Sequence, residues 1–180
     1  ETPISAENLK EDVDFAYKKL QKLHPNLYWY ISKEKLDFKF DSLKTTINKP
    51  LKPNEFYLKL SSVVSEVREG HLRIVAPEKK LTKKEIKKLK NQKGLLGRFS
   101  YYIENDQLYI KDNSEKIAGV KPGSEILSIN KEPISHIFKK YKPLITSDGY
   151  NTTYQKYSLA RRFPAFFTLE YGVLDSIKIE

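Results

Sequence analysis

Apolar residues follow helical spacing over the first seventy residues of this chain and form short alternating runs from about residue 95 onward. Between Ala6 and Leu23 they recur at steps of three and four, which predicts a helix with one buried stripe. His24-Pro25-Asn26 ends this helix, because proline disfavours helical backbone in the preceding residue. The stripe consists of Leu9, Val13, Ala16, Leu20 and Leu23.

Two further helices are predicted before residue 71. Ser32 is placed to cap the first of them, whose apolar face ends at Ile47. Pro53 suits the first turn of the next helix, which Gly70 can terminate. A short apolar run at Leu72–Val75 predicts a strand. Residues 1–75 are therefore predicted to form a small helical N-terminal domain.

A lysine-rich segment separates this domain from the rest of the chain. Residues 76–94 contain a capping-box pattern at Thr82–Glu85, which predicts the start of a helix. Eight lysines fall within fifteen residues here, so much of the net charge of +10 is local. A solvated connector helix explains the pattern. A nucleic-acid-binding module is the alternative, but the segment lacks stacking aromatic residues, so nucleic acid is not an expected partner.

From residue 95 to 180 the pattern indicates short strands with two helices among them. Asn105-Asp106 and Tyr171-Gly172 are typical of hairpin turns. Helices are predicted at residues 134–141 and 151–162. The fold class predicted for the chain is α+β, with a small, partly open barrel following the helical domain. The predicted strands are Phe99–Ile103, Leu108–Ile110, Ile126–Ile129, Phe166–Leu169 and Ser176–Ile179.

Composition narrows the chemistry that the chain can perform. A content of 39% hydrophobic and 12% aromatic residues is typical of globular proteins. No run of eighteen apolar residues occurs, so no integral membrane segment is predicted. The absence of cysteine excludes disulfides, thiolate metal sites and a cysteine nucleophile. Three histidines make a multi-histidine zinc site unexpected, and neither a metal nor a cofactor is predicted.

The segment Ile117–Ile134 resembles PDZ domains, in which an A-G-hydrophobic turn leads into a G-D-x-I-x-x-I-N-G strand. Gly119 and Gly123 permit turns with positive φ at the corresponding places. Ser124-Glu125 stands where G-D is usual, and Lys131 where glycine is usual. The resemblance implies that residues 95–180 form a PDZ-like domain, which binds extended peptides.

Glu69-Gly70-His71-Leu72 follows the third predicted helix and resembles the D-G-H-T motif of tricorn-like and C-terminal-processing (tail-specific) serine peptidases. His24–Tyr28 and Ser147–Asn151 also resemble segments of that family. In these enzymes the nucleophilic serine lies in a catalytic domain after the PDZ-like one, and no serine here has a G-x-S-x-G setting. The resemblance implies a non-catalytic recognition region of a peptidase that acts outside the cytoplasm, in the periplasm or secreted.

Two candidate sites follow from these resemblances. His71 is a candidate general base for a serine of the catalytic domain, or alternatively a histidine that orders a helix end by hydrogen bonding. Leu96, Gly97, Arg98 and Phe99 are the candidate peptide-binding loop, or alternatively an ordinary turn. The expected partners are a peptide or unfolded protein and the catalytic domain. A stand-alone peptide-binding adaptor is the alternative function.

One aromatic cluster is open to two interpretations. Tyr28, Trp29 and Tyr30 follow the end of the first predicted helix. They fit either a substrate platform or the core of a small domain.

Overall fold

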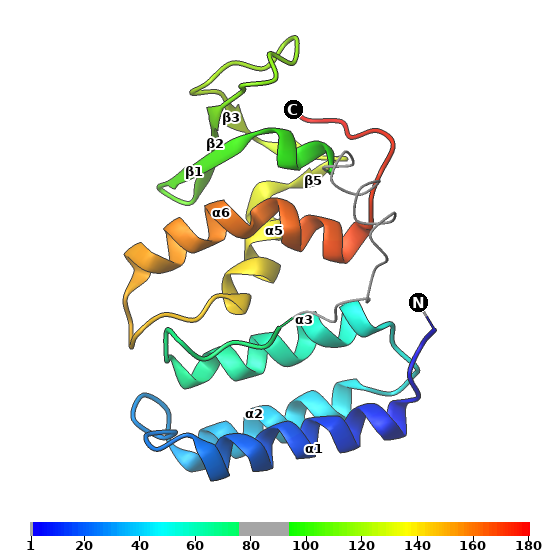
Figure 1. Cartoon of the computed structure of the whole chain (residues 1–180), viewed down its shortest axis with the longest axis vertical. Helices are drawn as coiled ribbons and strands as arrows, with labels where there is room; N and C mark the ends of the chain where they lie inside the picture. The colour runs from blue at the N-terminus through cyan, green and yellow to red at the C-terminus, as the bar shows by residue number, and fades with distance from the viewer. Residues whose placement is uncertain (1, 76–93) are drawn as a thin grey trace, which may run out of the picture. The chain divides into compact units, whose positions relative to one another are not determined.

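The computed structural model describes residues 2–75 and 94–180 (Figure 1). The described residues up to 75 group with Pro143–Asn151 into one compact unit, here called the helical unit. Residues from 94 to Lys142 group with Thr152–Glu180 into a second, here called the mixed unit. Residues 76–93 of the predicted connector, with its capping pattern, lie outside the described residues. The predicted domain boundaries stay predictions.

The helical unit contains three helices at the places that apolar spacing predicted: α1 (Ala6–Leu23), α2 (Lys33–Thr46) and α3 (Pro53–Val64). The Ser32 hydroxyl accepts a hydrogen bond from the Lys35 amide at 3.3 Å, which confirms it as the cap of α2. Pro53 occupies the first turn of α3, as expected.

The core of the helical unit lies between these three helices, which run side by side in Figure 1. The extended residues Ile4 and Leu51 exchange two backbone hydrogen bonds of 2.9 and 3.1 Å, which hold the approach to α1 against the approach to α3. The fully buried side chains include Leu9, Val13, Leu36, Phe40, Ile47 and Val67.

The chain after α3 differs from its prediction. The α-helix ends at Val64 and continues as the 3-10 turn η1 (Ser65–Val67), and Arg68 then adopts a left-handed backbone with φ of 57°. Arg68, rather than Gly70, therefore terminates the helix. The predicted strand at Leu72–Val75 is wrong, because no other described segment pairs with it.

The mixed unit begins with a 3-10 turn, η2 (Leu95–Arg98), and an antiparallel sheet of β1 (Ser100–Glu104), β2 (Gln107–Asp112) and β3 (Glu125–Ile126). The strand order is β1-β2-β3, so β1 is an outer strand of this sheet. Asn105 and Asp106 join β1 to β2 with φ of 46° and 61°, which confirms the predicted two-residue hairpin.

A second sheet pairs β4 (Ser128–Ile129) with β5 (Glu132–Pro133). The predicted strand at the C-terminus is reduced to one bridge between Ile179 and Ile129. The described residues thus confirm the α+β class, but they form two small open sheets instead of the predicted partly open barrel. Gly119 and Gly123 have φ of 80° and 85°, which confirms the positive φ predicted at these two glycines.

Two helices complete the mixed unit. Helix α5 (Ile134–Tyr141) matches its prediction and leads into η3 (Lys142–Leu144). Helix α6 (Thr152–Tyr171) runs along β1, and Figure 1 shows it across the sheet from end to end. No helix of the described residues has both the length and the apolar composition needed to cross a bilayer.

The length of α6 overturns two predictions. Residues Phe166–Leu169 continue the helix and do not form a strand, although Pro164 inside α6 removes one helical hydrogen bond. The helix continues because Phe163, Phe166 and Phe167 are all buried on its inner face. Gly172 donates its amide to the Thr168 carbonyl at 2.9 Å with φ of 77°, so it ends α6 and does not form a hairpin turn.

A polar network joins α5, β5 and α6. The Lys140 ammonium lies 2.6 Å from Glu170 and 3.1 Å from Glu132, and it donates to the Tyr171 hydroxyl at 2.8 Å. Tyr141 donates to Glu170 at 2.6 Å. Burial lowers the pKa of Lys140, but hydrogen bonds to the two carboxylates and the phenol outweigh it and raise that pKa. The network fixes α6 against the second sheet.

Candidate functional site

The turn after α3 is held by a loop that follows it by almost eighty residues. The Gly70 amide donates to Asp148 Oδ1 at 2.7 Å, and the Gly149 amide donates to the Arg68 carbonyl at 2.9 Å. A Cβ atom on Gly70 would lie 2.8 Å from the same carboxylate oxygen. A side chain at position 70 would therefore displace the Asp148 carboxylate from the Gly70 amide.

His71 is exposed at the end of this turn. Its backbone amide donates to Glu69 Oε1 at 3.3 Å, and the Leu72 amide donates to the Glu69 carbonyl at 3.0 Å. The hydrogen bonds that shape the turn therefore run through the backbone and the carboxylates of Glu69 and Asp148. The catalytic role predicted for His71 is not tested by this geometry.

The same loop also reaches the aromatic segment after α1. The Arg68 guanidinium lies over the Tyr150 ring, 4.4 Å from its centroid, and the Tyr150 hydroxyl donates to the Tyr30 carbonyl at 3.3 Å. The Tyr30 and Tyr150 rings meet edge to face at 6.4 Å. Two of the segments that resemble peptidase motifs, 69–72 and 147–151, thus meet within the helical unit, and Tyr30, two residues after the segment 24–28, contacts the same loop.

Trp29 is 72% exposed and Tyr28 and Tyr30 are 39% exposed, so the aromatic cluster forms a surface of the helical unit and not its core. A cleft of about 670 Å³ follows this surface. It is lined by Tyr28, Trp29, Tyr30, Ile31, Ser32, Glu34, Lys35, Phe38, Lys39, Glu66, Arg68 and Tyr150.

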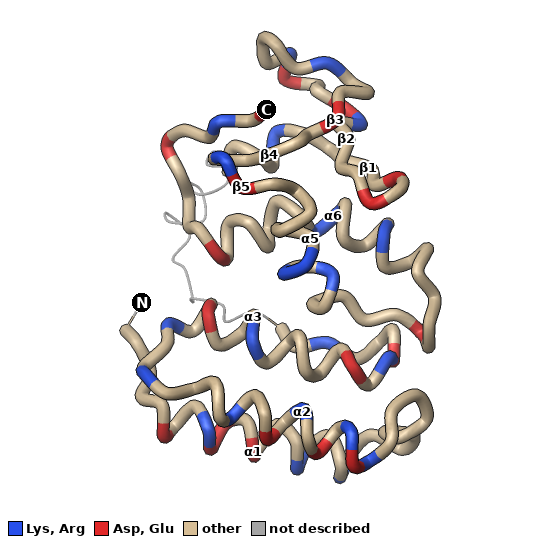
Figure 2. The backbone as a smooth tube through the Cα atoms, turned by 180° about the vertical axis from the view of Figure 1, so that it is seen from behind, with Lys and Arg blue, Asp and Glu red and all other residues tan. Residues whose placement is uncertain are grey.

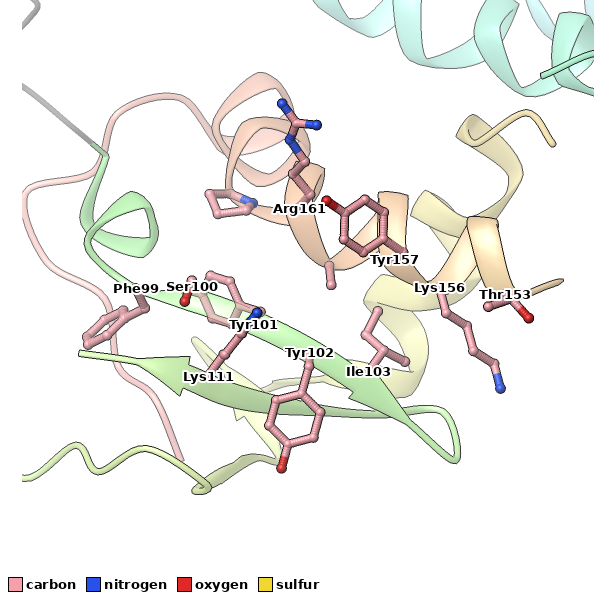
Figure 3. Close-up of a pocket in the computed structure, with 12 residues that line it drawn as sticks. Phe99, Ser100, Tyr101, Tyr102, Ile103, Lys111, Thr153, Lys156, Tyr157 and Arg161 are labelled. Atoms are coloured by element: carbon pink, nitrogen blue, oxygen red, sulfur yellow. The ribbon is translucent and has the colours of Figure 1, made fainter. Parts of the chain in front are cut away.

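The mixed unit carries a groove of about 710 Å³ between β1 and α6. Figure 3 shows Tyr157 and Arg161 on α6 across from Ser100 and Tyr101 on β1. β1 pairs with β2 through only one of its edges, and the groove follows four consecutive residues of this outer strand, Ser100–Ile103, and Phe99 directly before it. The lining residues are Phe99, Ser100, Tyr101, Tyr102, Ile103, Lys111, Thr153, Lys156, Tyr157, Ala160, Arg161 and Pro164.

The four residues predicted to bind peptide form the turn η2 and the position after it. Leu96 is buried, and its carbonyl accepts a hydrogen bond from the Tyr101 hydroxyl at 2.7 Å. The Gly97 amide donates to the Gly94 carbonyl at 2.7 Å, and the Arg98 guanidinium lies 3.8 Å from Glu115. Of the four, Phe99 lines the groove, directly before β1. The buried Leu96 side chain anchors the turn in the core of the mixed unit.

Sequence reasoning did not single out the α6 wall of the groove. Thr153, Tyr157, Ala160, Arg161 and Pro164 follow one another at steps of one, three and four, so they share one face of the helix. The signal was available, because a helix was predicted over residues 151–162. In the described parts of the chain, no three histidine or carboxylate side chains are grouped to hold a metal ion.

Comparison with solved structures identifies the fold. The chain matches the crystal structure of mature CPAF, a chlamydial serine protease, with a TM-score of 0.56 and 14% identity. The S499A mutant of CPAF matches with the same TM-score and 15% identity. Each match covers 87% of this chain, which spans 28% and 27% of the respective CPAF chains. The fold is therefore that of a region found in a serine protease.

No protein-family model and no curated protein sequence matches the chain.

Proposed function

We propose that this chain is the substrate-recognition and regulatory region of a serine peptidase. It binds extended peptide segments and presents them to a catalytic domain of the same protein. The observation that carries the proposal is the groove between the outer strand β1 and helix α6. An outer strand offers unpaired backbone groups along one edge, and an extended peptide binds there as an additional strand.

The turn Leu95–Arg98 supports this assignment by its place in the chain. It directly precedes β1, so a peptide paired with β1 would have one end beside it. PDZ-like domains receive a terminal carboxylate at a loop in this position. Arg98 is exposed there, and its guanidinium, 3.8 Å from Glu115, can turn to an incoming carboxylate. We therefore assign Arg98 and Phe99 to the end of the groove that receives the peptide terminus.

The similarity to CPAF supports the peptidase assignment. The chain spans 28% of mature CPAF, and in this proposal the catalytic machinery lies in another part of the full protein. In this proposal His71 is the general base, and it deprotonates a serine that the catalytic domain supplies. Asp148 positions His71 through the Gly70 amide. The extracytoplasmic location belongs to the same proposal.

A titration with extended peptides of about eight residues tests the proposal. Amide resonances of residues 99–103 and of the α6 wall should shift on binding, with weak affinity because one added strand buries little area. A peptide N-methylated at alternate residues cannot pair with β1 and should not bind. The chain alone should not hydrolyse any of these peptides.

Tyr157→Ala is the matching variant of the protein. Tyr157 is 65% exposed and lines the groove, so its loss should weaken binding several-fold without unfolding the chain. Tyr154→Ala on the same helix lies outside the groove lining and should leave the affinity unchanged. Peptide-induced shifts that never involve residues 99–103 would overturn the proposal.

A further inference from the structure

All charged residues that line the groove between β1 and α6 are basic. Among its twelve lining residues, Lys111, Lys156 and Arg161 are basic and none is acidic. Lys111 belongs to β2 beside β1, whereas Lys156 and Arg161 lie on α6, so cations stand on both walls. Figure 2 shows the basic positions along α6.

These cations are available to a ligand. None of the three forms an ion pair with the carboxylate of another described residue. Asp106, in the hairpin turn, lies near Lys156, but its carboxylate is already bound by Lys142 at 2.7 Å. The groove therefore keeps a net positive charge, and Asp106 offsets that of Lys156 only in part.

The apolar surroundings strengthen the field of these charges. The same walls carry the apolar and aromatic side chains of Phe99, Tyr101, Ile103 and Tyr157. Charges beside low-dielectric walls act more strongly on a bound ligand than charges on an open surface. A peptide paired with β1 projects alternate side chains toward α6, so side chains two residues apart approach the cations.

We propose that this groove selects extended segments with aspartate or glutamate side chains at alternate positions. The proposal rests on the proposed function and names its substrate class. Lysine side chains at those positions are repelled, which gives discrimination between acidic and basic segments of an unfolded protein. Each exposed cation contributes a factor of about two to five in affinity.

Three peptides of one length separate acidic selection from peptide binding itself. They have aspartate and glutamate, their amide counterparts asparagine and glutamine, or lysine at alternate positions, and all are amidated at the C-terminus. The acidic peptide should bind residues 99–103 about tenfold more tightly than the amide peptide at 0.05 M salt. The difference should shrink at 0.5 M salt, because screening removes it.

Variants of the protein locate the charge that is responsible. Arg161→Glu should abolish the preference for the acidic peptide and improve binding of the lysine peptide. Lys139→Gln changes the net charge by the same amount at an exposed position of α5, away from the groove lining, and should leave the preference intact. If Lys139→Gln weakens acidic binding as much as Lys156→Gln, net charge alone is responsible and the proposal fails.

The remaining outcomes distinguish the two proposals. Equal shifts at residues 99–103 with acidic and amide peptides would overturn acidic selection and retain peptide recognition. A free-acid version of the amide peptide is the fourth probe: binding by this peptide and by none of the amidated ones would assign the groove to the terminal carboxylate and overturn the side-chain proposal. No shift at residues 99–103 with any peptide would overturn the proposed function itself.

Discussion

Replacement of Asp148 by alanine tests whether the loop Pro143–Asn151 holds the turn that presents His71. The Asp148 carboxylate accepts the Gly70 amide at 2.7 Å, and Gly149 donates to Arg68 next to it. Alanine removes the first bond and leaves the Gly70 amide to water. The neighbouring bond from Gly149 should then weaken, because the same loop carries both.

The expected loss of stability follows from the charge of the Asp148 carboxylate that accepts the hydrogen bond. A hydrogen bond to a charged acceptor contributes about 1.5–3 kcal/mol to stability when it is buried. Gly70 is only partly buried, so water replaces part of the interaction. We therefore expect Asp148→Ala to lower the free energy of unfolding of the helical unit by about 1 to 2 kcal/mol. Asp148→Asn retains an oxygen acceptor and should lose about half as much.

Urea unfolding, followed by circular dichroism, measures the free energy of unfolding. Hydrogen exchange measures the exchange rates of the Gly70 and Gly149 amides directly. Both amides should exchange faster in Asp148→Ala, while the β1 amides stay unchanged. Asp175→Ala removes an exposed carboxylate of the mixed unit and is the control. An unfolding midpoint and Gly70 exchange rate equal to those of the wild type would refute the assignment of Asp148 to the turn.

Three further predictions concern His71 and the polar network of the mixed unit. In the full-length peptidase, His71→Ala should lower kcat by about a hundredfold or more with an unchanged unfolding midpoint; a nearly normal kcat in the folded variant would exclude the general-base role. Lys140→Met should cost about 1 kcal/mol in urea unfolding, since the partly exposed cation is screened by solvent, whereas Lys139→Met should be neutral. Burial raises the pKa of Glu132, but hydrogen bonds from Tyr171 and Lys140 outweigh it and lower that pKa. Glu132 therefore contributes stability above its unfolded pKa of about 4.5 that is lost as pH falls through the lower folded value. Denaturation curves between pH 3 and 6 should show this loss in the wild type and a smaller one in Glu132→Gln.

Local signals predicted the elements whose ends are set by nearby residues. The cap at Ser32, the stop at Pro25, the Asn105-Asp106 turn and α5 all depend on contacts within a few positions. The run Phe166–Leu169 has strong local strand propensity, yet it is helical. Tertiary packing decides here, because the buried aromatic residues of α6 share one helical face.

The candidate sites required more than local pattern. Gly70 and Asp148 were each part of a recognised motif, but the hydrogen bond between them spans 78 positions, and no periodicity reports such a contact. The predicted barrel does not form, because apolar runs indicate strand propensity but not which strands pair with one another. Strands β3, β4 and β5 are only two residues long. The groove combines a strand with a helix about fifty residues later, which sequence spacing alone does not pair.

The return of Pro143–Asn151 to the helical unit sets an order of events during synthesis. A ribosome adds about 5–20 residues per second, so Asp148 is made roughly 4 to 16 seconds after Gly70. During that interval the three helices can pack, but the Glu69–His71 turn lacks the carboxylate that holds it. The helical unit is thus completed by a segment translated after most of the mixed unit, and the bond between Gly70 and Asp148 can form only when translation has passed α5.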